Sequence, residues 1–314
     1  MPPPARAPEL RGPPRTALLT LSALVAFAAS SLITRRALMT DAIDPATFTL
    51  VRLGSGALAL ASFARLTTGP SRPVAPGSRW RAWGGAVALA LYAVPFSFAY
   101  ARLDAGIGAL LLFASVQVTM IAHGLATGDR PTPRAWLGSA GALVGLVLLT
   151  WPGASAVDRP GAASMVLSGV GWGAYSRVGA GEAAPARALA ASFWRAALLV
   201  APLAWLALPR LVDTTREGLA LALASGVLVS GVGYVAWYAA LPALGAPRAA
   251  LVQLAVPVLA ASFGVALLDE AITARLAVSG ALVIGGVALG LRARSRDAPA
   301  REFAQREARD APSA

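Results

Sequence analysis

Apolar residues fall along this 314-residue chain in ten runs, most of them long enough to cross a bilayer as one helix. The hydrocarbon core requires about 20 mostly apolar residues per helix, so runs of this length predict transmembrane spans. Proline and glycine punctuate the separators, as expected for loops. The predicted spans are Thr16–Ile33, Ala46–Arg65, Ala82–Tyr100, Gly106–Ala126, Ala135–Trp151, Gly161–Ser176, Ala188–Leu208, Gly218–Leu241, Ala246–Leu268 and Thr273–Leu291.

Two of these runs admit a second interpretation. The run Gly161–Ser176 is short and glycine-rich, so its hydrophobic signal is the weakest of the set. The first run follows several arginines and contains Ala26-Phe27-Ala28, which resembles a signal-peptide cleavage site. The apolar stretch continues past that site to Ile33, which favours a retained span.

Composition supports a membrane protein. Hydrophobic residues make up 57% of the chain and charged residues only 13%, whereas a soluble domain has about a quarter charged residues. So little polar surface cannot cover a globule in water, but lipid can cover an apolar exterior. We therefore expect an all-α integral membrane protein with about ten transmembrane helices.

The 27 basic residues are all arginines, and their distribution predicts an orientation. Short cytoplasmic loops carry an excess of basic residues, and most loop arginines fall on one side if both termini are cytoplasmic. The tails 1–15 and 292–314 are rich in arginine and mixed charge and are predicted to be disordered. The net charge of +12 therefore comes from arginines in loops and tails, where they set the orientation of the chain in the membrane. We expect a multi-pass protein of the cytoplasmic membrane that contacts lipid and does not bind nucleic acid.

The chain lacks the residues that several kinds of site require. It has no Cys and one His, which excludes disulfides, iron–sulfur clusters and thiolate zinc sites. Without Lys it can form neither a Walker P-loop nor a Schiff base. We expect no cofactor, no metal site and no enzymatic activity.

The two halves of the chain, 16–151 and 161–291, resemble each other when shifted by about 140 residues. Ala109–Val118 then falls on Ala249–Val258, and Asp129 falls on Asp269. Each half contains five spans, so the halves must have opposite orientations in the membrane. Such inverted repeats are typical of transporters that hold their substrate near the midplane.

Over about residues 16–291, the chain resembles the EamA-type branch of the drug/metabolite transporter superfamily. The most specific piece is the acidic turn 267–273 (LLDEAIT) with the glycine-rich helix after it, and Val256-Pro257-Val258 resembles the family's proline-centred segment. The first half departs from the pattern, with Gly128-Asp129-Arg130 where an acidic pair is expected. The resemblance implies export or exchange of amino acids or other small metabolites.

Arg52 and Arg195 lie well inside predicted spans, away from the span ends, at matching places in the two halves. A charged residue at the bilayer centre costs about 2.5–3.5 kcal/mol on insertion scales, so each requires a reason. Both could bind a substrate carboxylate or phosphate, snorkel to the headgroups, or bond helix-end carbonyls.

Other candidate substrate contacts are polar or aromatic. Gln117 and Gln253 are the only amides in the spans and should face the protein interior, as cavity lining or as bonds between helices. The aromatic residues of the sixth and eighth spans either line a cavity or belong to the interfacial belt; they are Trp172, Tyr175, Tyr234 and Trp237.

Pro95 and Pro257 lie inside spans, where each frees a backbone carbonyl, and are hinge candidates. The pairs Gly141/Gly145, Gly169/Gly173 and Gly286/Gly290 have GxxxG spacing, which marks close helix contacts. These contacts form within one protomer or between two, so a homodimer is one arrangement that they allow.

These observations predict a transporter that moves a small, amino-acid-like solute by alternating access, in the export direction. No Asp or Glu lies well inside a span, which favours facilitated diffusion or exchange over proton coupling. The alternatives are a membrane scaffold without transport and, with less support, a lipid-modifying membrane enzyme.

Overall fold

A computed structural model of the protein describes residues 13–67, 78–103, 105–128, 132–150, 158–178, 185–207, 213–268 and 274–291, and within them every regular element is a helix. The elements are α1 (Pro13–Met39), α2 (Pro45–Thr67), α3 (Ser78–Tyr100), α4 (Ala105–Ala126), α5 (Pro133–Thr150), α6 (Arg159–Val178), α7 (Pro185–Ala207), α8 (Arg216–Ala224), the π-helix η2 (Ser225–Gly233), α9 (Tyr234–Leu244), α10 (Ala246–Gln253), α11 (Val256–Leu268) and α12 (Ala274–Leu291).

The predicted spans are confirmed as helices. The eighth span is one rod made of α8, η2 and α9, and the ninth is α10 followed by α11. The largest difference is at the end of α1, which extends six residues past the predicted Ile33 to Met39. Polar partners support this extension, because Arg35 Nη1 donates to the Tyr100 carbonyl at 2.9 Å and Arg36 pairs with Glu217.

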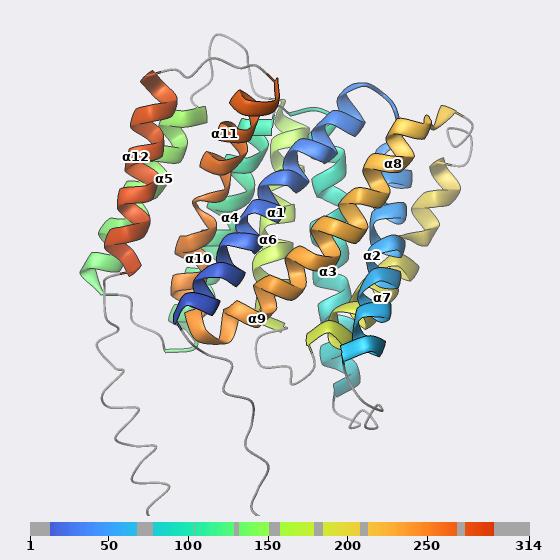
Figure 1. Ribbon diagram of the computed structural model, residues 1–314, viewed down its shortest axis with the longest axis horizontal. Coiled ribbons are helices and arrows are strands. Elements are labelled where there is room, and N and C mark those ends of the chain that lie inside the picture. Colours follow the sequence, from blue (N-terminus) through green and yellow to red (C-terminus); the bar gives the residue numbers. More distant parts are fainter. Residues whose placement is uncertain are drawn as a thin grey trace, which may run out of the picture.

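Helix contacts show the two inverted halves. Equivalent helices pack on each other, α2 on α7 and α5 on α12, and these two pairs form opposite ends of the bundle (Figure 1). The contact of α3 with α6 has its counterpart in η2 with α1, and that of α4 with α6 in α11 with α1. Exchanging the halves therefore reproduces the same contacts, as a pseudo-two-fold axis requires.

The first and last described helices end at one edge of the bundle. The start of α1 and the end of α12 both lie at the lower edge in Figure 1. The predicted disordered tails fall mostly on residues 1–12 and 292–314, which lie outside the described residues. Residues 13–15, also assigned to the first tail, begin α1.

The exterior of the bundle is apolar. Leu58, Val118 and Val232 are more than 60% exposed, on three different spans. A water-soluble protein seldom exposes large apolar side chains on so many of its helices, whereas lipid tails accept them. Among the described residues, five helices are long and apolar enough to cross a membrane, and four shorter apolar helices accompany them.

The GxxxG glycines bring helices together within the protomer. A Cβ atom on Gly286 would lie 2.6 Å from the Gly138 carbonyl oxygen, and one on Gly145 would lie 2.9 Å from Leu282. These contacts join α12 to α5, and Gly169 similarly approaches Leu112 of α4. At least one glycine of each pair, Gly145, Gly169 and Gly286, thus serves close packing inside one chain.

The π-helix η2 was not predicted from the sequence. It packs on α2, where a Cβ atom on Gly226 would lie 1.9 Å from Ser55 Oγ and 2.5 Å from the Arg52 carbonyl oxygen. Single π turns within α-helices occur frequently at functional sites. Here the wider turn and the missing side chain let the two halves touch backbone to backbone.

Gly226→Ala should lower the apparent Tm of the detergent-purified protein, because a backbone oxygen cannot move without shifting α2. Overpacking of this kind costs about 1–3 kcal/mol. Gly231→Ala is the matched control in the same π-helix, since its Cβ would meet only ordinary contacts at 3.5 Å or more. Equal melting of the two variants would contradict the close approach.

Candidate functional site

A cluster of aromatic rings fills the centre of the bundle, where helices of both halves meet. Phe27 lies at its middle, with ring centroids 5.2 Å from Trp172, 5.9 Å from Tyr234 and 5.7 Å from Trp237. Edge-to-face and tilted arrangements at these distances are favourable for aromatic pairs. The members of this aromatic cluster, all buried, are Phe27, Tyr92, Phe96, Tyr100, Trp172, Tyr175, Phe193, Tyr234, Trp237 and Tyr238.

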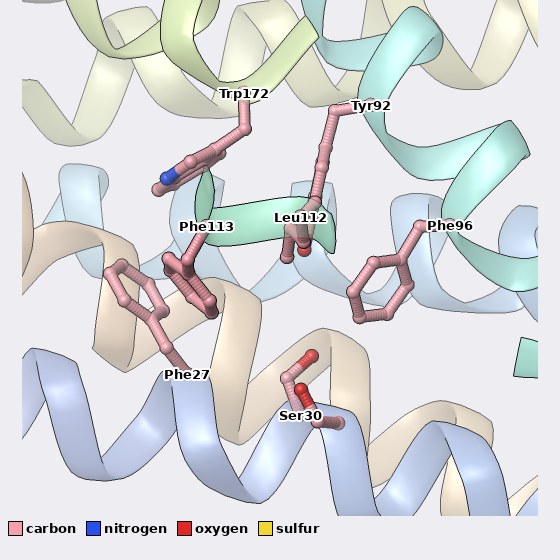
Figure 2. A pocket seen from close by; sticks show the side chains of 8 residues that line it. Phe27, Ser30, Tyr92, Phe96, Leu112, Phe113 and Trp172 are labelled. Carbon is pink, nitrogen blue, oxygen red and sulfur yellow. The ribbon is translucent and has the colours of Figure 1, made fainter. Parts of the chain in front are cut away.

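A pocket opens beside this aromatic cluster. It is narrow in this conformation, with a cavity volume of about 10 Å³, close to the space that one water molecule needs. Its lining residues come from α1, α3 and α4 of the first half and, through Trp172, from α6 of the second. Figure 2 shows the rings facing a common space, with the Ser30 side chain pointing into it. The pocket is lined by Phe27, Ser30, Ser31, Tyr92, Phe96, Leu112, Phe113 and Trp172.

Arg52 lies next to this pocket with 1% of its surface exposed. Its Nε donates to Ser230 Oγ of η2 at 3.1 Å, and its Nη2 donates to the Tyr92 hydroxyl at 2.9 Å. Its guanidinium carbon is 5.3 Å from the Tyr92 ring centroid and 5.0 Å from that of Phe96, both within the range of a cation–π contact. Arg52 therefore joins α2 and α3 of one half to η2 of the other.

Gln253 bonds the aromatic cluster from the broken ninth span. Its Oε1 accepts from Trp172 Nε1 at 2.5 Å, while its Nε2 donates to the Ala249 carbonyl at 3.4 Å. Helix α10 ends at Gln253, and α11 begins at Val256 after a tight turn. Pro257 explains the break, because its missing N–H leaves the Gln253 carbonyl without its usual helical donor.

The site thus combines a two-fold pattern of helices, a broken span and a central pocket between halves. A model of the EamA-like transporter family matches residues 14–151 and again residues 159–292 of the chain. The chain belongs to this family. Its transporter character and its multi-pass membrane fold follow from this membership and from the apolar helices.

Two further comparisons agree with the EamA-like assignment. The chain is 49% identical to "Uncharacterized protein PA1977" of Pseudomonas aeruginosa over 280 residues, which are 89% of this chain and 96% of that protein. A solved structure titled "Crystal structure of protein" matches with a TM-score of 0.70 over 87% of this chain and 94% of that one. At 22% identity this second likeness shows the fold alone.

The predicted site residues of this EamA-like protein separate into two groups. Trp172, Tyr175, Tyr234, Trp237 and Gln253 meet in or against the aromatic cluster, and Arg52 touches it through Tyr92. Trp172 lines the pocket itself.

Gln117 and Arg195 lie elsewhere. Gln117 Nε2 donates to Ser139 Oγ at 3.0 Å and so connects α4 to α5, away from the pocket lining. Arg195 is partly exposed and stacks over the exposed Trp83, 5.9 Å from its ring centroid. Trp83 precedes Tyr92 by nine residues in α3, about 14 Å along the helix, so the two arginines sit at different depths.

The two hinge candidates also differ. Helix α3 runs through Pro95 without interruption, whereas Pro257 follows the break in the ninth span. The resemblance-bearing residues Asp129 and 269–273 lie outside the described residues.

Ser30 was expected from the sequence to line a cavity together with aromatic residues, and it does line the pocket. Four other pocket residues were not predicted: Phe27, Ser31, Leu112 and Phe113. Phe113 could have been found, because under the 140-residue shift that relates the halves it falls on Gln253, a predicted site residue. Ser31 has no such counterpart.

Trp172→Phe should lower the apparent Tm, because the buried Gln253 oxygen loses its donor. Gln253→Met should also lower the apparent Tm, because the buried indole N–H of Trp172 loses its acceptor. The double variant strands neither group, so we expect a double-mutant cycle to show coupling of about 1 kcal/mol, within the range measured for polar pairs in membranes. Strictly additive effects would show that the hydrogen bond contributes nothing.

Proposed function

We propose that this EamA-like protein moves a small organic solute, metabolite-like in size, across the cytoplasmic membrane by alternating access. The observation that carries the proposal is the pocket between the two inverted halves, lined from both of them. Small-molecule sites are typically concave and apolar with a few polar groups, as this pocket is.

The depth of the pocket supports this function. Ser30 and Tyr92 both fall in the middle third of their helices, α1 and α3. A solute bound there is about equally far from both membrane faces. Inverted-repeat transporters bind at this depth and expose the site to each side in turn.

Polar contacts between the halves hold one edge of the bundle closed. Arg36 of α1 pairs with Glu217 of α8 at 2.9 Å, and Arg102 pairs with Asp158 at 3.6 Å. At the same edge the Thr215 N–H donates to the Ala42 carbonyl at 2.8 Å. All three contacts join one half to the other, so opening this edge requires that they separate.

The broken ninth span supports movement of one half against the other. The turn between Gln253 and Val256 interrupts the backbone ladder next to the aromatic cluster. Discontinuous helices of this kind form the binding sites of many carriers. Pro257 is accordingly proposed as a hinge, and the intact α3 at Pro95 moves as a rigid rod.

The proposal also includes the direction of transport and the orientation of the chain in the membrane. The excess of arginine in alternate loops supports a cytoplasmic position of both termini, and with that orientation the edge closed by Arg36 and Glu217 faces the opposite side. We propose export by facilitated diffusion or exchange. The EamA-like family is a transporter family and not an enzyme class, which fits a protein without catalysis.

Filling the pocket should abolish transport. Ser30→Phe places a ring where the Ser30 side chain now points into free space (Figure 2), and we expect loss of saturable counterflow in proteoliposomes across a panel of amino and organic acids. Ser262→Phe is the control, because Ser262 is exposed on α11 and outside the pocket lining. Wild-type flux equal to that of empty vesicles for every solute would favour a scaffold without transport.

Reporter fusions after Leu291 test the orientation. With a cytoplasmic C-terminus, a fused green fluorescent protein should fluoresce and a fused alkaline phosphatase should be inactive. Insertion of the phosphatase between Met39 and Pro45 should give high activity, because that loop then faces the other side. The reverse pattern would invert the proposed direction of transport.

A further inference from the structure

Arg52 has unused hydrogen-bonding capacity in the middle of the membrane. Of the five N–H donors of a guanidinium, one bonds Ser230 and one bonds Tyr92. Nη1 is buried and makes no well-aligned hydrogen bond among the described residues, although the buried Tyr234 hydroxyl lies close to the guanidinium. A buried donor without an acceptor is costly, and a charged one more so.

No protein carboxylate within the described ranges neutralises this charge. The ion pairs there involve Arg36 with Glu217 and Arg102 with Asp158, both at the edge of the bundle. Among the described residues that line the pocket there is neither Asp nor Glu. The nearby phenols of Tyr92 and Tyr234 are neutral, so the guanidinium is held in place without a counter-charge from the described part of the chain, which leaves it available for an anionic partner.

The aromatic contacts stabilise the cation without satisfying its donors. Tyr92 and Phe96 lie against the guanidinium at cation–π distances, an attraction that acts through the ring faces. The N–H groups point outward in the guanidinium plane and require lone pairs. Carboxylates provide two oxygen atoms in the geometry that Arg prefers.

We infer that the transported solute is an organic monoanion, with a carboxylate that binds Arg52 and a small apolar or aromatic body that lies against the pocket lining when the halves move apart and widen the pocket from its present volume of about 10 Å³. This inference rests on the proposed transport function and narrows its substrate class. Tyr92 connects the two parts, since its hydroxyl accepts from Arg52 while its side chain lines the pocket. The unpartnered hydroxyl of Ser30, on the described part of the pocket wall, gives the anion a second donor.

The same arrangement disfavours an ammonium group. The pocket lining offers it no carboxylate, and the faces of Tyr92 and Phe96 already hold a cation. A second positive charge next to Arg52 would be repelled in a medium of low dielectric constant. A simple acid should therefore bind better than the amino acid or the amine with the same body, which narrows the amino-acid-like solute expected from the sequence.

Three compounds with one body test the inference: 3-phenylpropanoate, phenylalanine and phenethylamine. The apparent Tm of the purified full chain is measured against the concentration of each, because a ligand stabilises the state that binds it. The acid should raise Tm at concentrations at least about tenfold lower than the amino acid, as expected for one charged hydrogen-bonding contact. The amine should give no rise, and an amine equal to the acid would overturn the inference.

Arg52→Gln separates anion recognition from folding. This variant loses the bonds to Ser230 and Tyr92, so its apparent Tm without ligand should fall, and its response to the acid is measured against its own ligand-free Tm. On that scale it should lose at least about tenfold in acid affinity. Arg65→Gln, an exposed arginine on the same helix, should respond to the acid as the wild type does. An unchanged response of Arg52→Gln would overturn the inference.

A second variant tests the anion site if Arg52→Gln does not fold, and a flux assay distinguishes anion binding from transport. If Arg52→Gln fails to fold, Tyr92→Phe removes one hydroxyl between the pocket and the guanidinium and should weaken acid binding without abolishing it; undiminished binding would contradict the site. Proteoliposome flux of the three compounds separates this inference from the transport function. Acid binding without flux would contradict the proposed transport function and leave the anion site intact. Flux of the amine in preference to the acid would contradict the anion site and leave the transport function intact.

Discussion

The burial of one guanidinium between the two halves is the constraint on which the rest of the structure depends. Arg52 is nearly inaccessible, yet it lies in a span that lipid surrounds. A charge in this position must be held by the protein interior. Tyr92 and Ser230 orient it, the rings of Tyr92 and Phe96 cover it, and the π-helix η2 brings Ser230 within reach. The tight approach of Gly226 to α2 follows from the same requirement.

The inverted symmetry of the helices explains why this site lies at the interface between the two halves. Equivalent helices pack on each other at both ends of the bundle, so the interface between halves passes through its centre (Figure 1). Symmetry holds for the helices but not for the side chains. Gln253 bonds Trp172 in the aromatic cluster, while Gln117 of the other half bonds Ser139 of α5. Equivalent amides of the two halves therefore have different roles, one at the centre and one between neighbouring helices of the first half.

The sequence predicts the helices well because lipid imposes a simple rule, about 20 apolar residues per span. The inverted repeat follows from the odd number of spans in each half. The interior is harder to predict, because hydropathy does not distinguish a side chain that faces lipid from one that faces a neighbour. Arg52 and Arg195 occupy matching places in the two halves, yet one is buried at the centre and the other lies over Trp83. The π-helix η2 has no sequence signal of its own, and Ser31 and Leu112 look like any other residues of a span.

The most direct test of the account is whether the two ends of the bundle open in turn. The chain contains no Cys, so spin labels can be placed without first removing a native cysteine. One labelled pair, Met39→Cys with Leu219→Cys, reports on the edge where α1 meets α8, and the pair Leu18→Cys with Ala243→Cys reports on the opposite end, where α1 meets α9. Pulsed electron spin resonance on vesicles with and without a transported solute should show reciprocal changes, one distance lengthening as the other shortens. Unchanged distances at both ends, under conditions where the solute crosses the membrane, would contradict alternating access between the halves.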